Sequence, residues 1–216
     1  MHTFYRQLPN QLTMLRLVLA AVFFVMLNCY RYGAASPVWL LPVAIVIFIL
    51  AAITDSLDGY LARRWHVESK FGRIMDPFCD KVLVIGAFVY LAGPRFVIPG
   101  AIGETDISFL SMASGVYPWM VAVILSRELL VTAIRGELEG EGVKFGANVW
   151  GKLKMILQSI VIPIVLLIVW LDPRSDPWQW TAWVRDILVY LTVIVTVVSG
   201  LPYITGAARA SRGDTG

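Results

Sequence analysis

The segment TDSLDGYLARRWHVESKFGRIMDPFCDK, residues 54–81, lies between two apolar runs, Val38–Ile53 and Val82–Leu91. Its four aspartates are Asp55, Asp58, Asp76 and Asp80. Acidic side chains beside long apolar runs need a reason, because an ionised group is costly near hydrocarbon. These aspartates therefore bear on both the fold and the function of the chain.

The composition is that of a membrane protein. Of the 216 residues, 58% are hydrophobic and only 15% are charged, and the mean hydropathy is +0.72. A soluble domain usually carries about 25% charged residues. Most of this chain is therefore expected to lie in a bilayer.

An all-α fold with six transmembrane helices is predicted, because an apolar run of roughly 20 residues spans a bilayer as a helix. The aromatic and basic segment Met1–Leu8 is expected to lie along the membrane interface before the first span. Residues 1–216 are interpreted as one membrane domain. The expected spans are Leu12–Tyr30, Val38–Leu61, Met75–Phe96, Val116–Leu138, Val149–Leu171 and Trp180–Ala207.

The basic residues predict the orientation. With six spans both termini lie on one side, and that side receives all of the 18 Lys and Arg except Arg31, Arg95, Arg174 and Arg185. The positive-inside rule then places the termini in the cytoplasm and the protein in the inner (plasma) membrane. Basic side chains that flank spans favour anionic lipid head groups as partners. Nucleic acid is not an expected partner, because these residues form no separate domain.

The aspartates form two pairs. Asp55 and Asp58 are three residues apart, and Asp76 and Asp80 are four apart, so each pair shares a helix face. The short polar segment between the pairs makes the two helices antiparallel neighbours, which brings the four carboxylates to a similar depth. A divalent cation would relieve their mutual repulsion. Oxygen ligands suit Mg²⁺ or Mn²⁺, so a site for such an ion is predicted here.

The complete pattern is Asp55-x2-Asp58-Gly59-x2-Ala62-Arg63-x8-Gly72-x3-Asp76-x3-Asp80. It resembles the signature of the CDP-alcohol phosphatidyltransferase family at all eight fixed positions. Three further segments resemble the bacterial phosphatidylglycerophosphate synthases of that family. They are LPNQLTMLR at 8–16, SRELLVTAIR at 126–135 and GKLKMILQ at 151–158.

The resemblance implies six transmembrane helices, usually in a homodimer, around a polar cavity open to the cytoplasm. It implies transfer of the phosphatidyl group of CDP-diacylglycerol to an alcohol, with release of CMP. Asp55, Asp58 and Asp76 are then ligands of two Mg²⁺ ions, with Mn²⁺ as an alternative, and Asp80 is the general base, near the second metal. The implied contacts with CDP-diacylglycerol are Gly59, Ala62, Arg63, Ser69 and Gly72.

The acceptor alcohol is predicted from basic residues near the fourth and fifth spans. An anionic acceptor needs such cations, and glycerol 3-phosphate fits them. Lys154 shares a helical stripe with Gln158 and is expected to face inward, whereas Lys152 points elsewhere and can extend to head groups. Glu128, seven residues before Arg135, is placed to pair with it. The candidate acceptor residues are Arg127, Arg135, Lys152 and Lys154.

Other functions fit parts of the pattern. An inositol phosphate acceptor satisfies the same electrostatics, which would make the protein a phosphatidylinositol-phosphate synthase. A divalent-cation transporter would also use intramembrane aspartates, but Arg63 beside the site would repel the ion. A non-catalytic lipid-binding scaffold gives no reason for Asp80.

Overall fold

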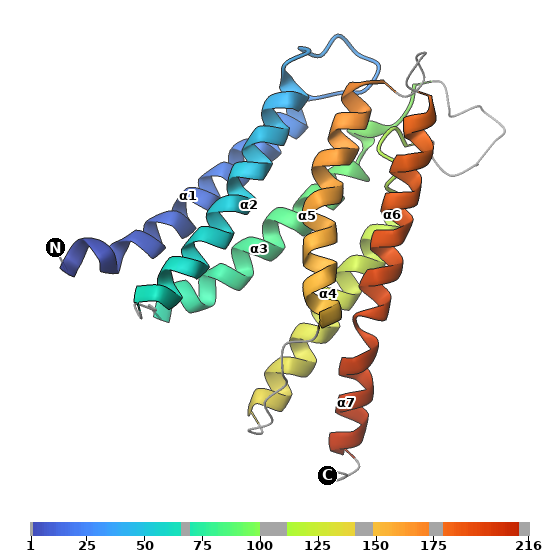
Figure 1. The fold of residues 1–216 in the computed structure, drawn as a ribbon. Helices are drawn as coiled ribbons and strands as arrows, with labels where there is room; N and C mark the ends of the chain where they lie inside the picture. The colour runs from blue at the N-terminus through green and yellow to red at the C-terminus, as the bar shows by residue number, and fades with distance from the viewer. Residues whose placement is uncertain (1, 66–69, 100–111, 141–148, 173–178, 212–216) are drawn as a thin grey trace.

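The computed structural model describes residues 2–65, 70–99, 112–140, 149–172 and 179–211 (Figure 1). Of residues 2–10, 56–65, 70–77, 80, 138–140, 149 and 208–211 only the backbone is described. This part of the chain is all-α, apart from one isolated antiparallel bridge between Val97 and Met112. The helices are α1 His2–Cys29, α2 Leu40–Trp65, α3 Lys70–Leu91, the 3₁₀ helix η1 Pro94–Phe96, α4 Pro118–Gly140, α5 Val149–Trp170, α6 Trp180–Val198 and α7 Leu201–Ser211.

Each expected span coincides with a helix, but several helix ends differ. Helix α1 begins at His2, so residues 2–8 are continuous with the helix of the first expected span. The last expected span is divided at Ser199 and Gly200 into α6 and α7. At this break the N–H of Gly200 donates to the carbonyl of Val197, three residues earlier, whereas an α-helix would use the carbonyl four residues earlier.

Three helical stretches within the described residues are long and apolar enough to cross a membrane: Gln11–Cys29, Trp150–Trp170 and Trp180–Ala207. Shorter apolar stretches occupy Leu40–Asp55 and Lys81–Leu91. The described part of the chain is therefore that of a helical membrane protein.

The hydrophobic core joins α1 to its neighbours. The Phe23 ring on α1 lies 5.3 Å from the Phe48 ring on α2, centroid to centroid. On α3, a Cβ added to Gly86 would lie 2.4 Å from the ring of Phe24, so glycine allows α1 and α3 to approach closely. Helix α5 contacts α2 and α6, while α4 contacts α6 and α7. These contacts place polar residues of α2 to α5 around a common interior.

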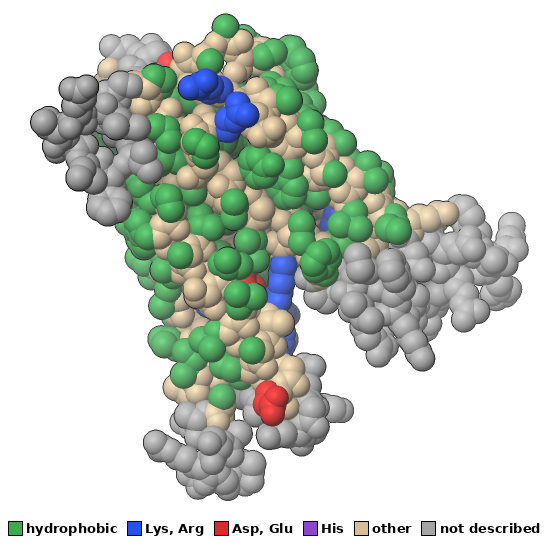
Figure 2. Space-filling model, turned by 180° about the vertical axis from the view of Figure 1, so that it is seen from behind, with side chains coloured by type: hydrophobic (Ala, Val, Ile, Leu, Met, Phe, Trp, Pro, Cys, Tyr) green, Lys and Arg blue, Asp and Glu red, His purple; other side chains and the backbone are tan. Residues whose placement is uncertain are grey.

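The ends of the bundle differ. Figure 1 shows the start of α1 and the end of α7 at the end of the bundle opposite η1, where α1–α3 diverge from α4–α7. Large apolar side chains cover the body of the molecule, and Figure 2 shows basic side chains in the hollow between its two lobes. Exposed Trp39 and Trp183 suit a membrane–water interface. Both cysteines, Cys29 and Cys79, are free thiols.

Candidate active site

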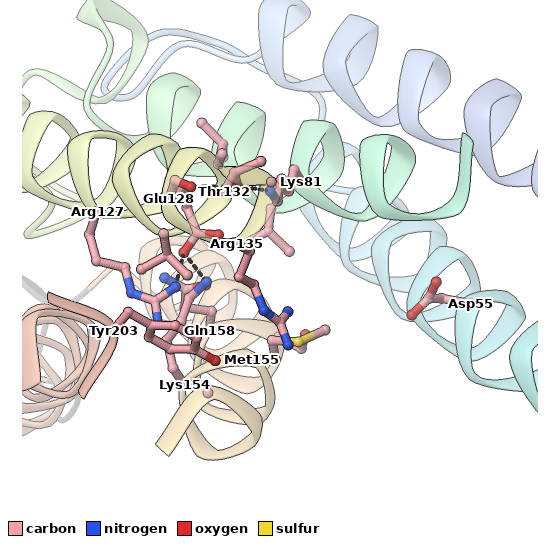
Figure 3. A pocket seen from close by; sticks show the side chains of 16 residues that line it. Asp55, Lys81, Arg127, Glu128, Thr132, Arg135, Lys154, Met155, Gln158 and Tyr203 are labelled. Atoms are coloured by element: carbon pink, nitrogen blue, oxygen red, sulfur yellow. Dashed lines mark hydrogen bonds and ion pairs between the residues drawn. The ribbon is translucent and has the colours of Figure 1, made fainter. Parts of the chain in front are cut away.

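A cavity of about 600 Å³ opens between α2, α3, α4, α5 and α7. Its wall combines apolar side chains from the helix faces with charged side chains from four of these five helices. The charged and polar lining residues are Asp55, Lys81, Arg127, Glu128, Thr132, Arg135, Lys154, Gln158, Ser159 and Tyr203 (Figure 3).

Positive charge predominates among the described residues of this lining. Among the lining residues whose side chains are described, four are cationic and two are carboxylates, Asp55 and Glu128. Charges at membrane depth are tolerated only where they pair or line a polar cavity. The excess of cations makes the cavity suitable for an anionic ligand. The four cationic residues are Lys81, Arg127, Arg135 and Lys154.

Glu128 on α4 organises one side of the cavity. Its Oε1 accepts a hydrogen bond of 3.0 Å from Nη1 of Arg127 and a second from Nζ of Lys154 on α5. Arg127 also donates through Nη2 to the carbonyl of Ser199, 3.1 Å away, at the break between α6 and α7. The expected pair of Glu128 with Arg135 is wrong, because helix packing brings α5 closer to this carboxylate than the position two turns along α4.

Arg135 lies apart from the Glu128 cluster. The carbon at the centre of its guanidinium is 5.6 Å from the centroid of the Tyr203 ring, which is within the range of a cation–π contact. Its Nε is buried and has no hydrogen-bond partner in the described part of the chain. In Figure 3 the side chain extends from α4 toward the side on which Asp55 lies. The N–H groups of Arg135 can thus donate hydrogen bonds to an anion in the cavity.

The other candidate acceptor residues divide clearly. Arg127 and Lys154 line the cavity, and Lys154 is only 6% exposed, as its helical stripe predicts. Lys152 is exposed and does not belong to the lining. Lys81 on α3, which the sequence did not single out, lines the cavity and donates to Oγ1 of Thr132. Its position next to Asp80 in the sequence is the signal that could have identified it.

Asp55 forms an ion pair with Arg16 of α1. Arg16, which is predicted only to lie on the cytoplasmic side with most other basic residues, is fully buried. An arginine just inside an apolar span is itself a signal of a buried partner, since an unpaired charge there is costly. Helix α1 therefore contributes directly to the environment of the first aspartate of the signature.

The remaining signature residues are placed only by their helices. Asp58, Gly59, Ala62 and Arg63 belong to α2, while Gly72, Asp76 and Asp80 belong to α3, and their side chains lie outside the described part. Ser69 lies outside the described residues altogether. Only four residues separate the end of α2 from the start of α3, so the two helix ends must lie near each other.

The available donor atoms fit a hard divalent cation. Asp55 is half-buried at the cavity, and the other three aspartates of the signature follow on α2 and α3 at helical spacing. Carboxylate oxygens are the preferred ligands of Mg²⁺. Among the residues whose side chains are described, no group of three or more His, Cys, Asp and Glu occurs, and Asp55 is the sole member of the signature set in that part.

Comparison with known proteins agrees with the signature. Residues 6–198 match the family "CDP-alcohol phosphatidyltransferase". A CDP-diacylglycerol–glycerol-3-phosphate 3-phosphatidyltransferase of Bacillus subtilis is 34% identical over 204 residues, which covers 91% of this chain and 92% of the relative.

Two further relatives extend the similarity over most of the chain. A probable phosphatidylglycerophosphate synthase of Mycobacterium tuberculosis is 33% identical over 94% of this chain and 82% of its own length. A CDP-diacylglycerol–glycerol-3-phosphate 3-phosphatidyltransferase of Salmonella typhimurium is 30% identical over 96% of each chain. With its signature, its charged cavity and a family match that spans nearly its whole length, this chain belongs to the CDP-alcohol phosphatidyltransferase family.

Proposed function

We propose that this enzyme transfers the phosphatidyl group of CDP-diacylglycerol to glycerol 3-phosphate, which yields phosphatidylglycerophosphate and CMP. The observation that carries the proposal is the cavity that places Asp55 of the signature in one lining with Arg127, Arg135 and Lys154. The names of relatives that cover most of the chain support the same donor and acceptor.

In the proposed arrangement all six spans cross the inner (plasma) membrane, with the termini and the cavity on the cytoplasmic side. The distribution of Lys and Arg supports this orientation. The acyl chains of the donor then stay in the lipid while its head group enters the cavity. We expect the protein to act as a homodimer.

The donor is held at the ends of α2 and α3. Asp55, Asp58 and Asp76 fit two Mg²⁺ ions, which when bound polarise the diphosphate and stabilise the departing CMP. The positions assigned to the CDP moiety are Gly59, Ala62, Arg63, Ser69 and Gly72. Small residues lower the helix surface there, and Arg63 offers a bidentate contact to phosphate.

The acceptor is held by the cationic wall. Arg135 presents its guanidinium to the phosphate of glycerol 3-phosphate, and Lys154 and Arg127, which both pair with Glu128, add positive charge beside it. Asp80 lies one turn after Asp76 on α3 and accepts the proton of the attacking hydroxyl. Attack at phosphorus then releases CMP.

The proposal is tested by incubating the purified protein with CDP-diacylglycerol, Mg²⁺ and a panel of alcohols, and by measuring CMP. We expect CMP release that depends on glycerol 3-phosphate. Release with inositol phosphate instead would assign the protein to the sister activity. No release with any alcohol, together with metal flux into liposomes, would identify a transporter.

A further inference from the structure

Glu128 is a buried carboxylate that donor binding, metal binding and proton transfer do not use. It is 7% exposed, and it lies on α4 within the cavity wall. A carboxylate beside an anion site weakens that site by direct repulsion. Its presence among the cations therefore needs a compensating role.

The contacts of Glu128 define that role. One oxygen, Oε1, accepts from both Arg127 and Lys154, so a single carboxylate fixes cations from two helices (Figure 3). Arg127 carries the connection to the carbonyl of Ser199, at the break that separates α6 from α7. The cluster thus joins α4, α5 and the α6–α7 break along one wall of the cavity.

We propose that Glu128 is a positioning residue, which holds the ammonium group of Lys154 and the guanidinium of Arg127 in place for the phosphate of the acceptor. This inference rests on the proposed function. Lysine and arginine side chains have many rotamers, and binding is weaker when a ligand must order them. An ion pair in the wall fixes both cations before the acceptor arrives, and the cluster still keeps one net positive charge.

Whether Glu128→Gln raises or lowers the KM for glycerol 3-phosphate shows whether Glu128 positions the cations or only repels the acceptor. If Glu128 positions the cations, Glu128→Gln raises the KM for glycerol 3-phosphate by roughly tenfold and leaves the KM for CDP-diacylglycerol within about twofold. Glu128→Asp, which keeps the charge, restores part of the loss. If Glu128 only repels the acceptor, Glu128→Gln lowers that KM, which would overturn the proposal.

A double-mutant cycle with Lys154→Met tests whether Glu128 acts through Lys154. We expect Glu128→Gln to add little to the acceptor KM once Lys154 is replaced, because the two changes remove one interaction. Fully additive effects would contradict the proposal. Glu137→Gln is the matched control, since Glu137 is an exposed carboxylate on α4 outside the cavity lining.

Binding of inorganic phosphate, measured by calorimetry, keeps the test independent of turnover. We expect the wild-type protein to bind phosphate and Glu128→Gln to bind it roughly tenfold more weakly. This result would support the inference even if CMP release required another acceptor and the proposed function failed. Equal binding by wild type and variant, or no binding by wild type, would overturn the inference.

Discussion

The cavity of the candidate active site, called the inner cavity below, differs from a second pocket at the opposite end of the bundle in how its polar side chains are paired. The second pocket, which we call the outer pocket, measures about 380 Å³ and is lined mainly by residues 30–38 and 169–172. There the hydroxyl of Tyr32 donates to Oδ1 of Asp172 over 2.8 Å, and Nε1 of Trp170 donates to the carbonyl of Val38 over 2.9 Å. Among its described lining residues the outer pocket has one cation, Arg31, and one carboxylate, Asp172.

In the inner cavity, the described cationic and acidic side chains are unequal in number and come from several helices. Among its described lining residues the cations outnumber the carboxylates, and these charged residues come from α2 to α5. In the outer pocket the hydrogen bonds fasten a loop to the end of α5, and Gly33 with φ of +74° lets that loop turn. The difference indicates that the outer pocket fastens a loop to α5, whereas the described lining of the inner cavity suits an anionic ligand.

The two pockets are expected to differ most in their effect on the rate of turnover, kcat. Asp80 precedes the cavity residue Lys81 in the sequence. The substitution Asp80→Asn removes the proposed base and should lower kcat by about 10²–10⁴-fold. Binding of Mn²⁺, followed by electron paramagnetic resonance, should stay largely intact. If metal binding falls in step with turnover, Asp80 is mainly a metal ligand.

Arg135→Ala should have the next largest effect. It removes charge-assisted hydrogen bonds to the acceptor phosphate, so we expect the KM for glycerol 3-phosphate to rise by roughly 10- to 100-fold. The KM for CDP-diacylglycerol should change little. Lys152→Ala is the control, because Lys152 is exposed and outside the lining. An unchanged acceptor KM in Arg135→Ala would remove Arg135 from the site.

Arg16→Met tests the buried ion pair at the other side of the inner cavity. It removes the ion pair between Arg16 and Asp55, and we expect a loss of about 1–3 kcal/mol in the free energy of unfolding in detergent. Addition of Asp55→Asn should recover part of this loss, because the charge of Asp55 is then gone. A destabilisation that the second substitution does not relieve would point to lost packing of Arg16.

The smallest effect is expected in the outer pocket. Tyr32→Phe deletes the hydrogen bond to Asp172 and should destabilise the protein by about 1 kcal/mol. Turnover of the folded enzyme should not change. A clear rise in either KM would show that the outer pocket communicates with the site, and the contrast between the two pockets would not hold.

The helices could be predicted because each depends on a local property, the length of an apolar run. Helix α5, Val149–Trp170, agrees with its predicted span to within a residue. The break at Ser199 and Gly200 was not predicted from hydropathy, and at this break Arg127 of a distant helix donates to the carbonyl of Ser199. Helix ends that depend on tertiary contacts cannot be read from hydropathy.

The same limit applies to the site. The inward direction of Lys154 could be predicted from its spacing to Gln158 on one helix. The partners of Glu128 and the burial of Arg16 could not, because both depend on which helices pack together. Spacing along a single helix predicts which residues share a face, and the packing of helices decides which charges meet.

The central claim is that α2 and α3 bring their aspartates together beside the cationic cavity to hold hard divalent ions. Anomalous diffraction from crystals of the full protein loaded with Mn²⁺ tests this directly. We predict a peak about 2 Å from the carboxylate oxygens of Asp55 and of an aspartate on α3. A well-ordered structure in which Asp55 contacts only Arg16, while the aspartates of α3 face another surface with no shared ion, would contradict it.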